Sequence, residues 1–135
     1  MTDRLRSIAP KVHVAGQLGI DDIASARAMG IERVVNNRPD GEDPNQPDSP
    51  AVEQAVRDAG LDYVHLPVVG LPSPDQIQAA AALLADGRAT LLYCRSGMRS
   101  AALWAMATAT AGRASPEGIR NAAAQAGYDL TRLPL

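Results

Sequence analysis

Short β-prone runs alternate with helical segments along this chain of 135 residues, and that alternation limits the fold more than any other feature. The expected strands cover residues 12–15, 31–35, 61–69 and 90–93. The expected helices cover residues 21–29, 51–59, 73–85, 100–111 and 115–127. This order predicts an α/β fold of three layers, in which a mainly parallel sheet of four to five strands carries helices on both faces.

Local signals at helix ends and loops refine this prediction. Ser73 and Gln76 form the two halves of a capping box, so a helix is expected to begin there. At the helix over 21–29, Asp21 or Asp22 is expected near the N-cap. The segment over 36–50 is a polar loop with four prolines, and loops of this length in compact domains are often functional.

Composition and charge exclude several classes of function. With 13 basic and 15 acidic residues the net charge is −2, which argues against nucleic acid or an anionic membrane surface as the main partner. The length predicts a single domain over residues 1–135. We expect neither a signal peptide nor a membrane span, because no long apolar run is present. The single cysteine indicates a reducing compartment, so the protein is expected to be cytoplasmic. Two histidines and one cysteine, widely spaced, predict no metal site, and no cofactor is expected.

The segment over 90–100 reads as strand, tight loop and helix, and it carries the chemistry that we expect. Cys94 ends the strand and therefore lies at the N-terminus of the following helix, where free N–H groups and the helix dipole stabilise a thiolate. Gly97 permits the backbone conformation that turns successive N–H groups inward. Arg99 offers a two-pronged donor to an anionic substrate, and Ser100 is expected to donate a hydrogen bond to the sulfur.

The substrate-binding residues are predicted from the same loop and from a second strand end. They are Arg38, Arg95, Ser96, Gly97 and Met98. Arg38 is included because it follows a predicted strand, and the carboxyl ends of parallel strands share one edge of a sheet. The alternative for Cys94 is a buried, inert packing residue. Two flanking arginines are poor neighbours for such a residue, so we expect a reactive cysteine.

The loop CRSGMRS resembles the active-site loop of rhodanese-type sulfurtransferases, in which four residues separate the cysteine from the arginine. Cysteine phosphatases separate the two by five. The rest of the chain is similar to a bacterial family called beta-lactamase-hydrolase-like, whose members have the fold of dual-specificity phosphatases. The similarity covers nearly the whole chain and is carried, besides the loop, by residues 15–17, 35–40, 63–68 and 101–104. It implies a cysteine-phosphatase-like fold and an association with sulfide-oxidising or persulfide-processing enzymes.

Two departures from the phosphatase pattern favour sulfur over phosphate. The four-residue spacer closes a smaller ring of amides, which suits one sulfur atom better than a tetrahedral phosphate. Dual-specificity phosphatases carry an aspartate after a strand like that ending at Val69, where this chain has Gly70, so the expected proton donor is missing. Sulfur transfer between thiolates needs no such donor, because its leaving group is a stable anion. Asp40 or Asp75 could serve as an acid instead, which keeps the phosphatase open.

We therefore expect a sulfurtransferase that moves sulfane sulfur from thiosulfate or a small persulfide to a thiol acceptor through a persulfide on Cys94. The alternative is a cysteine-dependent phosphatase that acts through a phosphocysteine, and a third hypothesis is a non-catalytic anion- or persulfide-binding module. The expected partners are the anionic sulfur donor, the small thiol acceptor and a persulfide-processing or sulfide-oxidising enzyme. His13 and His65 are expected to be structural, and the charges over 40–43 to form a solvated turn.

Overall fold

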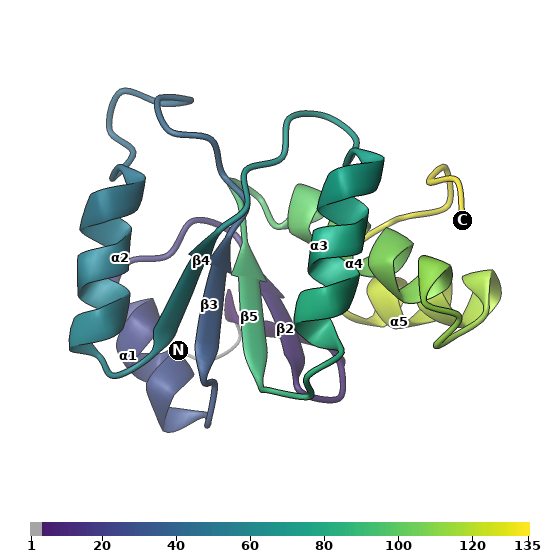
Figure 1. The fold of residues 1–135 in the computed structure, drawn as a ribbon, viewed down its shortest axis with the longest axis horizontal. Helices are drawn as coiled ribbons and strands as arrows, with labels where there is room; N and C mark the ends of the chain where they lie inside the picture. The colour runs from purple at the N-terminus through teal and green to yellow at the C-terminus, as the bar shows by residue number, and fades with distance from the viewer. Residues whose placement is uncertain (1–3) are drawn as a thin grey trace.

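Five strands form one mixed sheet between two layers of helices (Figure 1). The structure is a computed structural model that describes residues 4–135; residues 1–3, at the start of the segment for which no signal peptide is expected, lie outside the described residues. The strands are β1 (Arg6–Ala9), β2 (Val12–Ala15), β3 (Arg33–Asn36), β4 (Asp62–His65) and β5 (Thr90–Tyr93). The helices are α1 (Ile20–Ala28), α2 (Ser49–Asp58), α3 (Pro74–Leu84), α4 (Met98–Thr110) and α5 (Pro116–Gln125).

The strand order is β1-β2-β5-β3-β4, and all neighbours are parallel except β1 and β2. The predicted mainly parallel sheet is therefore confirmed. Strand β1 was not predicted, because it is a four-residue edge strand in which Ile8 alone is fully buried and whose register shifts between Ser7 and Ala9. Lys11 turns the chain into β2 with a φ of 62°, a left-handed conformation that side chains other than glycine rarely adopt.

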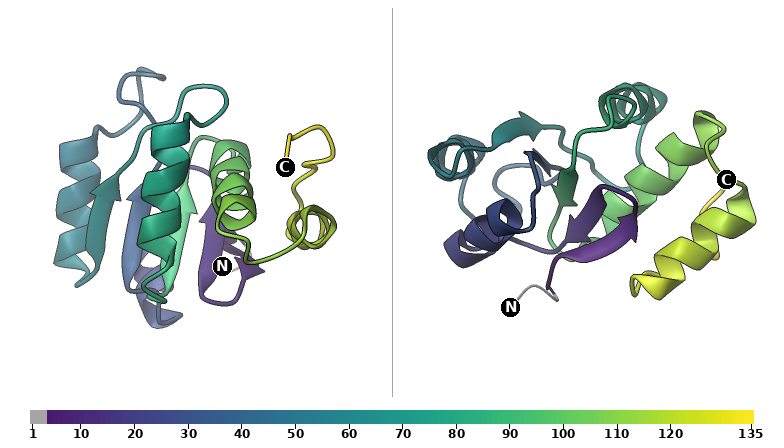
Figure 2. Two further views of the ribbon diagram at one scale, coloured as in Figure 1. Left: turned by 45° about the vertical axis from the view of Figure 1, so that its right-hand side comes forward. Right: turned by 90° about the horizontal axis from the view of Figure 1, so that it is seen from below.

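Helices cover both faces of the sheet, as Figure 2 shows from below: α1 and α2 lie on one face, and α3, α4 and α5 lie on the other. Successive residues of the central strands point to opposite faces. Val34 and Leu91 pack in the core under α1 and α2, whereas Val35 and Leu92 pack in the core under α3, α4 and α5. The predicted three layers are confirmed. Within residues 4–135, no helix combines the length and the apolar content that a bilayer crossing requires.

The four parallel strands end level with one another, at the upper edge of the sheet in Figure 1. Tyr93 at the end of β5 lies beside Ala15 of β2 and Asn36 of β3, and Asn36 lies beside His65 of β4. The segments that leave these four strand ends therefore meet at a single edge. This is the edge at which parallel sheets place their sites.

The caps of two helices match the sequence-based expectations. The Ser73 hydroxyl accepts the N–H of Gln76 at 3.2 Å and the Gln76 side chain accepts the N–H of Ser73 at 2.9 Å, so the capping box of α3 is confirmed. At α1 the N-cap is Gly19, and the Asp22 carboxylate accepts its N–H at 2.7 Å. The expectation of Asp21 or Asp22 near the N-cap is therefore confirmed: both lie in the first turn, and Asp22 reaches back to the cap.

At the opposite edge of the sheet a buried arginine ties β3 to the end of α3. Arg33 is 5% exposed, and its guanidinium donates to both carboxylate oxygens of Asp86 at 2.7 and 3.0 Å. The same guanidinium donates to the Thr90 hydroxyl, at 2.9 Å from Nη2. Arg33 lowers the pKa of Asp86 from 3.8 to about 2, helped by the backbone N–H of Arg88. Because the folded pKa is depressed, the stabilisation is present above pH 3.8 and is lost as the pH falls through about 2.

We therefore expect Asp86→Asn to lower the urea midpoint of unfolding at pH 7, and the gap from the wild type to close as the pH falls from about 4 to about 2. Thr90→Val is the matched control, since it removes an uncharged partner of Arg33 and its effect should not vary with pH in this range. A gap for Asp86→Asn that stays constant down to pH 2 would show that the ion pair does not contribute to stability.

Candidate active site

The Cys94 sulfur lies inside the loop that joins β5 to α4. Its side chain is fully buried, and the N–H of Gly97 donates to the sulfur at 3.1 Å. Gly97 is the N-cap of α4 and has a φ of 94°, in the left-handed region. A Cβ on Gly97 would lie 2.2 Å from the hydroxyl of Tyr128, so glycine is required there by conformation and by space. The N-terminus of a thirteen-residue helix and one aimed N–H thus face the sulfur, as predicted.

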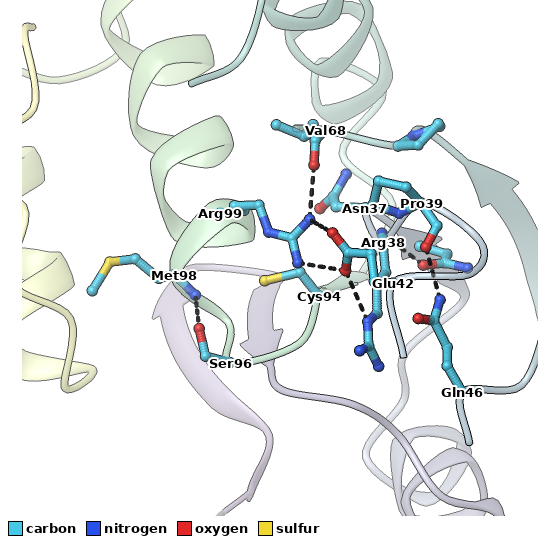
Figure 3. A network of polar contacts seen from close by, with 12 residues as sticks. Asn37, Arg38, Pro39, Glu42, Gln46, Val68, Cys94, Ser96, Met98 and Arg99 are labelled. Atoms are coloured by element: carbon cyan, nitrogen blue, oxygen red, sulfur yellow. Dashed lines mark hydrogen bonds and ion pairs between the residues drawn. The ribbon is translucent and has the colours of Figure 1, made fainter. Parts of the chain in front are cut away.

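Arg99 lies in the first turn of α4 with its guanidinium beside Cys94 (Figure 3). Nη1 donates to Glu42 Oε2 and to the Val68 carbonyl, both at 2.8 Å, and Nη2 donates to Glu42 Oε1 at 2.9 Å. The Glu42 carboxylate and, to a lesser extent, the nearby Cys94 sulfur raise the pKa of Arg99 above its ordinary value. The predicted two-pronged donor is therefore present. In this structure its two Nη atoms bind the carboxylate of Glu42, a residue of the same chain.

Glu42 was not predicted as a site residue. Its carboxylate accepts from both Nη atoms of Arg99 and from Arg38 Nε at 3.0 Å, so it joins two guanidinium groups. Hydrogen bonds from Arg99, and then from Arg38, hold the pKa of Glu42 below its ordinary value although burial opposes this. Residues 40–43 form a mostly exposed turn, as predicted, but the ion pairs of Glu42 with Arg38 and Arg99 were not foreseen. The only signal in the sequence was the length of the proline-rich loop, which identifies no particular side chain.

Arg38 lies 3% exposed after β3 and reaches the site through Glu42. Its Nη1 donates to the Gln17 side chain at 2.8 Å, and its carbonyl lies 2.9 Å from Nε2 of His65, which supports the structural role expected for that histidine. Nη2 is buried and has no hydrogen-bond acceptor within residues 4–135. Direct contact of Arg38 with a substrate stays a prediction.

Ser100 differs from its expected role. Its hydroxyl donates to Asn37 Oδ1 at 2.8 Å, and the Asn37 amide donates to the carbonyl of Leu66 at 2.9 Å. The predicted hydrogen bond from Ser100 to the Cys94 sulfur was wrong: the hydroxyl proton is directed to Asn37, and the sulfur receives the N–H of Gly97 instead. Ser100 thereby links α4 to the segments that follow β3 and β4.

The remaining loop residues face solvent. Arg95 and Met98 are exposed, and the hydroxyl of the exposed Ser96 accepts the N–H of Met98 at 3.3 Å. The Arg95 carbonyl accepts the N–H of Gln17 at 3.2 Å, and a Cβ on Gly16 would lie only 3.0 Å from that carbonyl. The segment after β2 therefore supports the loop by a close backbone approach.

Tyr128 is a second residue that sequence reasoning missed. It follows α5 and covers Gly97, and burial holds its pKa above the ordinary value although the nearby Arg6 opposes this. Asp40 and Asp75, the two alternative acids, have other surroundings: Asp40 accepts the N–H of Ser49 at 2.8 Å at the start of α2, and Asp75 is exposed in the first turn of α3. Within residues 4–135 no cluster of His, Cys, Asp or Glu could hold a metal ion.

The geometry predicts that Glu42 positions Arg99. In Glu42→Gln an amide N–H₂ group replaces one carboxylate oxygen and lies against the N–H donors of the arginines. The guanidinium of Arg99 should therefore lose its fixed orientation. We expect kcat/KM of any reaction through Cys94 to fall by about 10- to 100-fold, with the loss mainly in kcat. Steady-state kinetics checks this, alongside a thermal melt that confirms folding.

Asp43→Asn is the matched control, since this carboxylate lies on the same loop and accepts only the N–H of Asn45 within the described residues. It should change kcat/KM by less than about twofold. A lower KM with unchanged kcat in Glu42→Gln would mean that Glu42 only competes with the substrate for Arg99 and does not position it.

Comparison with known proteins identifies relatives along most of the chain. A sequence profile for "Beta-lactamase hydrolase-like protein, phosphatase-like domain" matches residues 4–111. A beta-lactamase hydrolase-like protein of Xylella fastidiosa (strain 9a5c) is 33% identical over 131 residues, which make up 96% of this chain and 30% of that protein. One from Agrobacterium fabrum (strain C58) is 32% identical over 125 residues, or 91% of this chain and 29% of that protein. The chain thus spans less than a third of the length of these relatives.

Solved structures agree with the fold. A candidate phosphatase from Neisseria meningitidis superposes with a TM-score of 0.81 at 26% identity, over 97% of this chain and 93% of that one. Kinase associated phosphatase superposes with a TM-score of 0.75 at 16% identity, over 92% of this chain and 82% of that one, which is a likeness of fold alone. The fold is that of the cysteine phosphatases, as predicted. With a profile match over most of its length and relatives above 30% identity, the chain belongs to the beta-lactamase hydrolase-like family, as a phosphatase-like domain.

Proposed function

We propose that the chain is an enzyme in which the Cys94 sulfur attacks the sulfane sulfur of an anionic donor. The observation that carries the proposal is the state of the carboxylate beside the nucleophile. Glu42 is held ionised by Arg99 and Arg38, which lower its pKa, so it is a poor proton donor at neutral pH. A reaction at this site is favoured when its leaving group departs as a stable anion and needs no proton, as in sulfur transfer.

The transfer takes two displacements. With thiosulfate, the Cys94 thiolate attacks the outer sulfur, the S–S bond breaks, and sulfite leaves with the bonding electrons, so a persulfide anion remains on Cys94. An acceptor thiolate then attacks the terminal sulfur, and Cys94 leaves as the thiolate. Arg99 holds the oxyanion part of the donor with N–H groups that are not used for Glu42 and Val68. The N–H of Gly97, whose nitrogen lies 3.1 Å from the sulfur, stabilises negative charge on it.

The acceptor comes from outside this chain, whose single cysteine is the nucleophile. We extend the proposal to the partners expected from the sequence: thiosulfate or a low-molecular-weight persulfide as donor, a small thiol as acceptor, and a persulfide-processing or sulfide-oxidising enzyme that consumes the product. A cytoplasmic location, where thiols remain reduced, belongs to the same proposal.

The second candidate is a cysteine-dependent phosphatase, and the comparisons support it more directly than sulfur transfer. The family profile is described as phosphatase-like, and the superposed structures include kinase associated phosphatase. In this reaction Cys94 attacks phosphorus, the ester oxygen leaves, and water hydrolyses the phosphocysteine. Gly70 and an ionised Glu42 supply no proton to the leaving oxygen, so only esters with good leaving groups should react well.

Incubation with thiosulfate or a small persulfide should leave one sulfur atom on Cys94, seen by intact-mass spectrometry and removed by an added thiol. Cys94→Ser should show no adduct and no sulfur transfer, because no other cysteine is present. Aryl phosphate hydrolysis is measured on the same samples. An unmodified Cys94 after treatment with several donors, together with efficient hydrolysis, would place the phosphatase first.

Gly70→Asp tests whether a missing proton donor limits phosphatase chemistry. A side chain fits there, because no heavy atom lies within 4 Å of a Cβ built on Gly70, and aspartate tolerates its φ of +65° better than most residues. Hydrolysis of alkyl phosphates should rise by roughly 10- to 100-fold, whereas nitrophenyl phosphate should respond less. Gly70→Asn, which has the same shape and no acidic proton, is the control. Equal rates in the two variants would show that the acid is not the limiting group.

A further inference from the structure

A groove of about 290 Å³ begins at Arg99 and lies beside the loop that carries Cys94. It is bounded by the segment between β4 and α3, by the first turns of α4 and by the C-terminal residues after α5. Its walls are mainly apolar and consist of Leu71, Met98, Ala102, Leu130, Leu133 and Pro134. Two further charged residues line it: Asp129, whose carboxylate accepts the N–H and hydroxyl of Thr131 at 3.0 and 2.8 Å, and the exposed Arg132.

Large apolar side chains are exposed at this groove. Leu71 is 62% and Met98 42% exposed, and both line the groove. They are two of the five large apolar side chains exposed within residues 4–135. Contiguous exposed apolar surface beside a polar site is typical of ligand-binding grooves.

Arg99 is common to the groove and to the contact with Glu42. In Figure 3 the Glu42 carboxylate faces the guanidinium of Arg99, while the Met98 side chain extends away from Glu42 and Cys94. Arg99 therefore contacts the charged Glu42 and also lines a mainly apolar groove, in which Asp129 and Arg132 are the other charged lining residues. A molecule bound at both Arg99 and the groove would be anionic at one end and apolar at the other.

The geometry points to an amphipathic anion as the substrate: an anionic group that reacts at Cys94 and is bound by Arg99, attached to an alkyl or aryl body that lies in the groove. Charge complementarity with Arg99 orients the anionic group, and burial of the Leu71 and Met98 side chains favours binding of the apolar body. This inference rests on the proposed reaction at Cys94 and narrows its donor from inorganic thiosulfate to an organic thiosulfonate or persulfide. For a thiosulfonate, the Cys94 thiolate takes the terminal sulfur as its S–S bond breaks, and the sulfinate leaves with the electron pair.

Binding is tested with methane-, butane- and octanesulfonate, which cannot donate sulfur. The measurement is how far each sulfonate protects Cys94 from alkylation by iodoacetamide. Cys94 is the single cysteine, so alkylation reports on it alone. Each added methylene should lower the protecting concentration by roughly two- to fourfold, until the groove is filled. In parallel, kcat/KM for sulfur transfer should rise from thiosulfate to methane- and benzenethiosulfonate. A thermal melt at each concentration excludes unfolding by the longer sulfonates.

Leu71→Gln and Met98→Gln change exposed side chains and should leave the fold intact. In both variants we expect the ratio between octane- and methanesulfonate protection to fall by at least about threefold. Met29→Gln is the control and should keep the wild-type ratio, because it alters an exposed apolar residue that caps the C-terminus of α1 and does not line the groove. Protection independent of chain length, or a ratio unchanged in the groove variants, would overturn the inference. Chain-length dependence without sulfur transfer would keep the groove and refute the proposed function instead.

Discussion

Two guanidinium groups from different parts of the chain share the Glu42 carboxylate, and the candidate site depends on that shared contact. Arg38 follows β3 and Arg99 opens α4, and each would be a poorly compensated positive charge without Glu42 between them. The same Arg99 also donates to the Val68 carbonyl after β4, and Arg38 donates to Gln17 after β2. Through these two arginines, one carboxylate is linked to the segments that follow all four parallel strands. The pKa of Glu42 is lowered because the carboxylate contacts both arginines.

Regular patterns in the sequence predicted the elements that are stabilised by interactions between residues close in sequence. The strand over 90–93 and the capping box at Ser73 appear as expected because β-propensity and cap chemistry involve neighbouring residues. Strand β1 escaped prediction because an edge strand needs only one buried residue, and its pairing with β2 is fixed by tertiary contact. Domain extent was predicted from length alone, and it stays a prediction.

The position of Cys94 at a helix N-terminus was predictable, but its neighbours were not. The Ser100 hydroxyl was assigned to the sulfur from proximity in sequence, whereas the fold offers it a better acceptor in Asn37, 63 residues away. Glu42 and Tyr128 come from a loop and from the segment after α5, and nothing local marks them as partners of the site. Long-range polar contacts of this kind are set by the assembled sheet edge. These contacts decide which side chains lie around Cys94, whereas the sequence motif identifies Cys94 alone.

The complete burial of Cys94 has a consequence for its oxidation chemistry. A thiolate becomes a sulfenic or sulfinic acid only when a peroxide reaches the sulfur, so exposure matters as much as ionisation. In this structure the N–H of Gly97 donates to the sulfur, Arg99 lies beside it and Tyr128 covers Gly97, so a peroxide reaches the sulfur only when these residues move. An anion bound beside Arg99 would block the same path. It would thereby shield Cys94 from oxidation in a chain that has no second cysteine for disulfide formation.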